Sequence, residues 1–229
     1  MKVWMVANQK GGVGKTTSVV TIGAILAQQG KKVLMVDTDP HASLTYYFGI
    51  DSEELDMSVY DLFMHSSSRN KEQILQSLCP TPYENFDILP ATMGLATLDR
   101  ALGKKGGMGL ILKKAIAKLE DSYDVALIDC PPVLGVLMVN ALAACDRIII
   151  PVQTEFLALK GLDRMMKTME IMQGAQDDTF KYTIVPTMYD KRTKASLLAY
   201  RKLQELYGDN VWSGVIPIDT QFRNASLAQ

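Results

Sequence analysis

The sequence predicts an α/β fold: a mostly parallel, twisted sheet with helices on both faces. Short runs of β-branched and other apolar residues alternate along the chain with longer segments of helical period. The short runs are apolar throughout rather than alternating, which indicates strands that are buried on both faces. Strand–helix–strand units of this kind connect by right-handed crossovers, and their ligands bind beyond the carboxyl ends of the strands.

Seven strands and five main helices are expected in this order. The expected strands are Val3–Ala7, Val33–Val36, Asp87–Leu89, Val125–Ile128, Arg147–Val152, Tyr182–Val185 and Gly214–Ile216. The expected helices are Lys15–Gln29, Gly109–Leu119, Leu137–Ala144, Leu157–Met172 and Ala195–Tyr207. The region Asp51–Pro82 is more polar and irregular, so short peripheral helices are expected there.

Length and composition favour one domain over residues 1–229. A chain of 229 residues can bury about 70% of its unfolded surface around one core. It shows no Pro/Gly/Ser-rich linker, low-complexity tract or internal repeat that would divide it. The net charge of −1 provides no global field toward nucleic acid or an acidic membrane, so any such binding needs a local patch.

The three cysteines and the amino terminus indicate a cytoplasmic protein. Cys79, Cys130 and Cys145 are widely spaced and odd in number, which argues against a zinc site or a disulfide framework. The apolar stretch Met1–Ala7 is too short for a signal peptide or a spanning helix.

A glycine-rich loop with lysines follows the first expected strand and precedes a helix. Its residues are Lys10, Gly11, Gly12, Val13, Gly14, Lys15, Thr16 and Thr17. The glycines let backbone N–H groups converge on an anion, and the helix directs its positive end at it. Lys15 can reach the β- and γ-phosphates of a nucleotide, and the Thr16 hydroxyl can ligate Mg²⁺. A second cluster, Gly103–Gly109, lacks both the preceding strand and the Lys-Thr pair, so we interpret it as a loop before a helix.

Carboxylates follow two other expected strands. Asp37-Thr38-Asp39 comes after Val33–Val36, and Asp129 ends the apolar strand before Cys130-Pro131-Pro132. Carboxylates beside a phosphate loop can hold Mg²⁺ through water and orient an attacking water. The sequence therefore predicts Thr16, Asp39 and Asp129 as metal-site residues.

Together these motifs resemble the deviant Walker A ATPases of the ParA and MinD family, and the resemblance covers the whole chain. It rests on K-G-G-V-G-K-T at Lys10–Thr16, on D-T-D-P-H at Asp37–His41 and on D-C-P-P at Asp129–Pro132. It implies a P-loop NTPase fold, binding of ATP/ADP with Mg²⁺, slow ATP hydrolysis and an ATP-dependent homodimer. The roles that it implies are catalytic for Lys10, Lys15 and Asp39, with Lys10 crossing to phosphates of the partner subunit. His41 replaces the usual glutamine.

The resemblance extends to the base side of the nucleotide. Pro151–Glu155 resembles P-V-Q-x-E, Thr187–Asp190 resembles T-M-Y-D, and Ile216-Pro217 resembles I-P. It implies that Thr187, Met188 and Pro217 line an adenine pocket.

The cargo and the surfaces that bind it are less defined. Basic residues crowd one carboxyl-terminal segment, and ParA relatives use such residues to hold DNA through its phosphates. They are Lys191, Arg192, Lys194, Arg201, Lys202 and Arg223. A solvated helix face is the competing interpretation.

Within the family, several segments resemble the ParA-like ATPases (ParC) of polar chemotaxis clusters. They are Asp39–Thr45, Leu95–Arg100, Gly107–Leu112 and Ile216–Ser226. The implied partners are an array-coupling protein and a polar landmark protein, with recruitment to the cell pole. Plasmid or chromosome partition is the alternative cargo. No Lys-rich amphipathic helix of the MinD type is visible, and a short helical tail after Gln229 is expected to be lacking.

Two further classes stay open at this point. An electron-transfer reductase or a ligase could use the same scaffold, but a reductase needs cluster-ligating cysteines, and the spacing of Cys130 and Cys145 argues against them. A binding module without catalysis is the other alternative.

Overall fold

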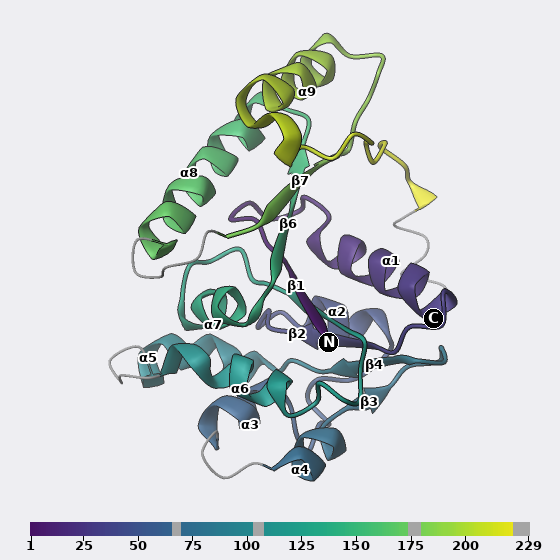
Figure 1. The fold of residues 1–229 in the computed structure, drawn as a ribbon, viewed down its shortest axis with the longest axis vertical. Helices are drawn as coiled ribbons and strands as arrows, with labels where there is room; N and C mark the ends of the chain where they lie inside the picture. Colours follow the sequence, from purple (N-terminus) through teal and green to yellow (C-terminus); the bar gives the residue numbers. More distant parts are fainter. Residues whose placement is uncertain (66–69, 103–107, 174–179, 222–229) are drawn as a thin grey trace.

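The computed structural model describes residues 1–65, 70–102, 108–173 and 180–221. In this part of the chain, seven strands form one sheet in the order β3-β4-β2-β5-β1-β6-β7 (Figure 1). The strands are β1 (Lys2–Val6), β2 (Val33–Asp37), β3 (Cys79–Pro80), β4 (Phe86–Leu89), β5 (Val125–Asp129), β6 (Arg147–Gln153) and β7 (Tyr182–Thr187). All neighbouring pairs are parallel except β3 and β4, which are antiparallel.

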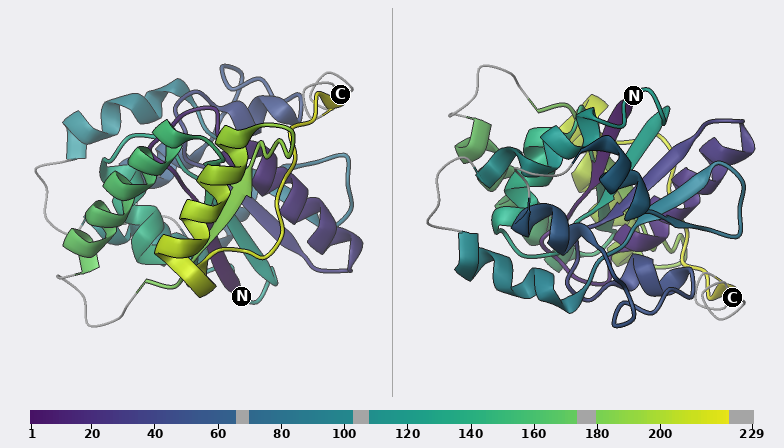
Figure 2. Two further views of the ribbon diagram at one scale, coloured as in Figure 1. Left: turned by 90° about the horizontal axis from the view of Figure 1, so that it is seen from above. Right: turned by 90° about the horizontal axis from the view of Figure 1, so that it is seen from below.

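Helices cover both faces of the sheet. They are α1 (Lys15–Gln28), α2 (Ser43–Tyr47), α3 (Val59–Met64), α4 (Lys71–Gln76), α5 (Leu98–Leu102), α6 (Ile111–Ala117), α7 (Val136–Ala144), α8 (Phe156–Gln173) and α9 (Lys194–Tyr207). Figures 1 and 2 show α1 on the opposite side of the sheet from α7 and α8. Helix α8 packs against α9 near the β7 edge.

Strand residues alternate between two buried apolar clusters. In β2, Val33 and Met35 face the cluster under α1, whereas Leu34 and Val36 face the cluster under the opposite helices. This period of two is the pleat of a strand, and both faces are apolar because both are covered. The continuous apolar runs in the sequence follow from this burial.

Six of the seven expected strands are confirmed, and the expected strand Gly214–Ile216 is wrong. This segment runs beside β7 but touches it only through isolated bridges and single bonds, such as Ile216 N–H to Pro186 O at 2.8 Å. Pro186 lies within β7 and has no N–H to donate, so a continuous ladder cannot form on that edge. The seventh strand is instead β3, which pairs with β4.

The expected helices are confirmed with small shifts of their ends. The expected helix Gly109–Leu119 begins as a 3₁₀ turn, η2 (Met108–Leu110), before α6; similar turns form η1 (Met93–Thr97) and η3 (Gly208–Asn210). The short helices expected within Asp51–Pro82 are α3 and α4, although that region also supplies β3. Residues 103–107 of the second Gly/Lys cluster lie outside the described residues. None of the described helices combines the length and apolarity needed to cross a membrane.

Candidate nucleotide-binding site

The glycine-rich loop joins β1 to α1 at the carboxyl end of the sheet. Gly12 has φ of 71° and Gly14 has φ of 89°, left-handed values that favour glycine. Gly14 caps α1, and no side chain accepts from its first N–H groups and no acidic residue lies in its first turn. The amino end of α1 therefore presents free donors and a positive dipole toward the loop.

Gly11 is unusual because nothing in the described part of the chain requires a glycine there. A Cβ built on Gly11 would meet no atom within 4 Å, and its φ lies outside the left-handed region. Among the described residues, the space above Gly11 is therefore open and could take a ligand or another copy.

Asn8 holds the loop in place. Its side-chain amide donates to Pro151 O at 2.7 Å, and its Oδ1 accepts from Lys10 N at 2.9 Å. The Asn8 side chain is 1% exposed, so these bonds form in a dry environment, where they are strongest. The sequence reasoning missed Asn8; its position between the first strand and the first glycine was the only available signal.

Lys15 and Thr16 begin α1 and point their polar groups into the loop. Lys15 is 8% exposed, and its ammonium donates to the carbonyl of Lys10 at 3.3 Å, so the side chain curls back over the loop. Thr16 Oγ1 donates to Asp129 Oδ2 at 2.6 Å. A buried ammonium next to free helix N–H groups is a site for a multiply charged anion.

The strand ends bring acidic groups to the same place. Asp37 and Asp129 are opposite each other on the paired strands β2 and β5. Burial raises the pKa of Asp129, repulsion from Asp37 raises it further, and the bond from Thr16 and the charge of Lys15 oppose the rise. Burial also raises the pKa of Asp37, whereas bonds from the Thr45 N–H and hydroxyl lower it. Two buried carboxylates with raised pKa values indicate a place for a cation.

The surroundings of Asp129 show whether Mg²⁺ fits between the loop and the strand ends. Its Oδ1 is buried and has no hydrogen-bond partner among the residues that the structure describes. Within the described residues no three His, Cys, Asp or Glu side chains converge as a cage for a metal. Mg²⁺ suits such a site because it keeps several waters and combines one or two protein oxygens with phosphate oxygens. The Thr16 hydroxyl and Asp129 would hold it, and Asp39 lies close enough to act on both carboxylates electrostatically.

Asp39 is half-buried in the turn after β2. One of its oxygens accepts from His41 N at 3.0 Å, and its own N–H donates to Asp37 Oδ1 at 3.1 Å. These bonds fix the Asp39 carboxylate in the turn after β2, where its charge acts on Asp37 and Asp129. His41 is exposed and lies away from the core.

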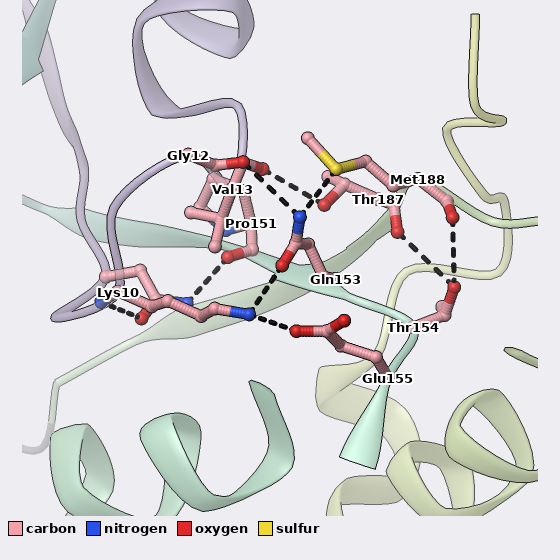
Figure 3. A network of polar contacts seen from close by, with 10 residues as sticks. Lys10, Gly12, Val13, Pro151, Gln153, Thr154, Glu155, Thr187 and Met188 are labelled. Atoms are coloured by element: carbon pink, nitrogen blue, oxygen red, sulfur yellow. Dashed lines mark hydrogen bonds and ion pairs between the residues drawn. The ribbon is translucent and has the colours of Figure 1, made fainter. Parts of the chain in front are cut away.

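The three residues expected around adenine come from β7 and the segments after it, and Figure 3 shows Thr187 and Met188 beside the loop. Thr187 Oγ1 donates to Val13 O at 3.0 Å, which ties the end of β7 to the glycine loop. Met188 has φ of 51° and is 38% exposed, so its side chain stands out at this edge. Pro217 pairs with Tyr189 through an isolated bridge.

The side chain of Lys10 contacts groups at and just after the end of β6 in its own chain. Its ammonium donates to Gln153 Oε1 at 2.6 Å and forms an ion pair with Glu155 of the same chain (Figure 3). Gln153 and Glu155 were noted only as part of a motif, and their contact with Lys10 was not expected.

The basic segment lies on α9 and the turn before it. Lys191, Lys194 and Arg201 are exposed, and Lys194 and Arg201 are seven residues apart on one face of the helix. Arg192 pairs with Asp190, and Lys202 pairs with Glu205, so part of the positive charge is neutralised locally. Arg223 lies outside the described residues.

Comparisons with known proteins agree with this geometry. The family model described as AAA domain, AAA_31, matches residues 1–182. The sporulation initiation inhibitor protein Soj of Bacillus subtilis (strain 168) is 36% identical over 229 residues, covering 100% of this chain and 87% of its own length. The chromosome-partitioning ATPase Soj of Treponema pallidum (strain Nichols) is 38% identical, with 100% and 85% covered.

A solved structure shares both sequence and fold. Cobyrinic acid a,c-diamide synthase from Mycobacterium smegmatis, crystallised with an ATP analogue and magnesium, superposes with a TM-score of 0.87 at 37% identity, covering 100% of this chain and 91% of that one. The glycine loop, the paired strand-end aspartates and these similarities lead to one conclusion: the chain belongs to the AAA_31 family of ParA-type P-loop ATPases, close to the Soj and ParA chromosome-partitioning proteins.

Proposed function

We propose that residues 1–229 act as one P-loop ATPase domain that binds ATP with Mg²⁺, dimerises on it and hydrolyses it slowly to partition DNA. The observation that carries the proposal is the loop at Lys10–Thr17, where a buried Lys15 faces the buried, partly unsatisfied Asp129. The relatives support DNA as the cargo, since two of them are named as chromosome-partitioning proteins.

In this proposal each residue of the site has a defined task. Backbone N–H groups of Gly11–Thr17 and the ammonium of Lys15 bind the β- and γ-phosphates, while Thr187, Met188 and Pro217 border the adenine. Thr16 and Asp129 hold Mg²⁺, which would neutralise phosphate charge when bound. Asp39 orients the attacking water, since it follows β2 and its charge acts on the buried pair Asp37 and Asp129.

The dimer face lies at the carboxyl ends of the central strands, where the loop follows β1. Val133 and Leu134 follow β5, and Phe156 and Leu157 follow β6, so these residues come after the carboxyl ends of the two strands that neighbour β1. Their exposure reaches 71% at Leu157. Exposed apolar groups around a charged site mark an interaction surface. A second copy would cover them, and Lys10 would then face the partner's phosphates.

Replacing Asp39 by Ala tests the hydrolytic role. We expect phosphate release to fall by at least about tenfold, while dimers formed in ATP and Mg²⁺ persist, because only the water-positioning group is lost. Phosphate release and sedimentation velocity measure the two effects. Asp51→Ala, which removes an exposed carboxylate on a nearby loop, is the matched control. Dimers that dissociate as fast as the wild type would contradict the role of Asp39.

The basic face of α9 provides the test for DNA. Replacing Lys194 and Arg201 by Ala should weaken binding to non-specific duplex DNA and reduce the slope of log K against log salt by up to about 2, roughly 0.9 per lost phosphate contact. Fluorescence anisotropy in ATP at several salt concentrations measures this slope. Lys113→Ala with Lys114→Ala, an exposed pair on α6, is the control. An unchanged slope would leave this face as a solvated helix surface.

A polar chemotaxis array is the second candidate cargo. It is supported by the segments Asp39–Thr45 and Leu95–Arg100, which resemble ParA-like proteins of such arrays, with a coupling protein and a polar landmark protein as partners. The named relatives favour partition over this cargo. Pull-down of the ATP-bound Asp39→Ala protein with array proteins and with a centromere-binding partition protein separates the two.

A further inference from the structure

The side chain of Lys10 is committed to contacts inside its own chain. Its ammonium donates to Gln153 Oε1 at 2.6 Å and is paired with Glu155 Oε1. Both acceptors lie at the end of β6, the strand next to β1, so they approach the loop from the side (Figure 3). Two of the three donors of the ammonium are therefore directed to acceptors of its own chain.

The orientation of the Gln153 amide follows from its other contacts. Its Nε2 donates to Met188 Sδ at 2.7 Å and to Gly12 O at 3.5 Å. A thioether sulfur and a carbonyl oxygen only accept, and an ammonium only donates. The amide therefore has one satisfying orientation, with its oxygen toward Lys10.

Exposure limits the strength of these contacts. The side chain of Lys10 is 31% exposed and that of Glu155 is 49% exposed. Ion pairs this accessible to water shift an equilibrium by roughly 1.4- to fivefold. Such contacts are strong enough to select one position of the lysine and weak enough to be broken by the charge of a triphosphate.

We propose that Glu155 and Gln153 hold Lys10 within its own subunit before ATP is bound, and that dimerisation must break this hold. The inference rests on the proposed ATP-dependent dimer. Glu155 and Gln153 are then positioning residues that set how readily the dimer assembles. Each of these contacts stabilises the separate subunit in this proposal, so removing one should favour the dimer.

Glu155→Gln tests the proposal through the dimer dissociation constant, measured by sedimentation in a saturating non-hydrolysed ATP analogue with Mg²⁺. Two lysines are released per dimer, so the constant should fall by about two- to twenty-fivefold. Gln153→Ala should change it in the same direction. Glu205→Gln is the matched control, because it removes the acidic partner of Lys202 on α9, far from the loop.

A second measurement follows Lys10 directly in the nucleotide-free protein. Reductive methylation, quantified by peptide mass spectrometry and normalised to the exposed Lys194, should be faster at Lys10 in Glu155→Gln than in the wild type. An unchanged rate, or a dimer that is unchanged or weaker in Glu155→Gln, would overturn the proposal. Lys10→Ala distinguishes failure of the proposed dimer from failure of the proposed hold on Lys10. If this variant dimerises like the wild type, the proposed dimer face is wrong, whatever the result for Glu155→Gln.

Discussion

Gly11 and Gly12 are adjacent, but they are glycine for different reasons. Gly12 has a left-handed backbone conformation with φ of 71°, which residues with a Cβ atom adopt only at an energetic cost. Gly11 has neither that conformation nor a crowded Cβ position. The chain's own fold therefore explains Gly12, whereas no contact within the described residues explains Gly11.

Substituting Val at each position separates these reasons. Gly11→Val should leave the free energy of unfolding within about 0.5 kcal/mol of the wild type and abolish ATP-dependent dimers, since Val would project into the dimer face. Gly12→Val should cost about 1–2 kcal/mol of stability through backbone strain. Urea unfolding and light scattering measure both quantities. Normal dimers in Gly11→Val would show that the space above this residue stays outside the interface.

At the residue scale, motifs located the groups but not their contacts. Lys15, Thr16 and Asp129 were predicted together because loop, helix and strand end are local patterns that a sheet edge must bring together. The partnership of Lys10 with Glu155 spans 145 residues and depends on how β6 ends beside β1. The buried bonds of Asp37 to Thr45 were missed for the same reason, although Asp37 is the first acid of the D-T-D motif.

At the scale of elements, α1 positions the site by packing tightly on the sheet. Gly23 faces Phe86 of β4, and a Cβ at Gly23 would lie 2.4 Å from Phe86 Cε2. Phe86 is 1% exposed, so it has little room to move. The close approach of helix to sheet therefore depends on this glycine.

Gly23→Ala tests that dependence. We expect a loss of about 1–3 kcal/mol in the free energy of unfolding from overpacking, even though Ala is a better helix former than Gly by about 1 kcal/mol. Thr21→Ala, on the exposed side of α1, is the control and should be near neutral. Urea unfolding measures both. A stabilised Gly23→Ala protein would show that α1 shifts without cost.

The elements that sequence predicted best are the long, strongly patterned ones. The buried strands β2 and β5 are continuous apolar runs because both of their faces are covered, and α8 shows a helical period because one of its faces packs inward. The expected strand Gly214–Ile216 does not form because its potential partner β7 contains Pro186. The sequence of the segment itself does not indicate which strand it would pair with. The strand β3 was missed because two residues at a sheet edge, one of them Pro80, carry no strand period.

At the scale of the whole molecule, the carboxyl ends of the parallel strands gather the groups proposed to bind and hydrolyse ATP. The phosphate loop, the acidic pair and the base-side residues lie there, with the apolar residues of β5 and β6 around them. The topology explains this, because parallel strands end on one edge and β1 lies between β5 and β6. Sequence could predict the fold class and this edge. It could not predict which contacts the lysines make before a nucleotide arrives.

The central claim is that the loop at Lys10–Thr17 binds a triphosphate through Lys15. Isothermal titration calorimetry of a non-hydrolysed ATP analogue with Mg²⁺ tests it, comparing the wild type with Lys15→Ala. We predict one site per chain and a loss of affinity of about 100-fold in the variant, as expected when a charge-assisted contact with phosphate is removed. Equal affinity in the two proteins would place the nucleotide elsewhere and contradict the account.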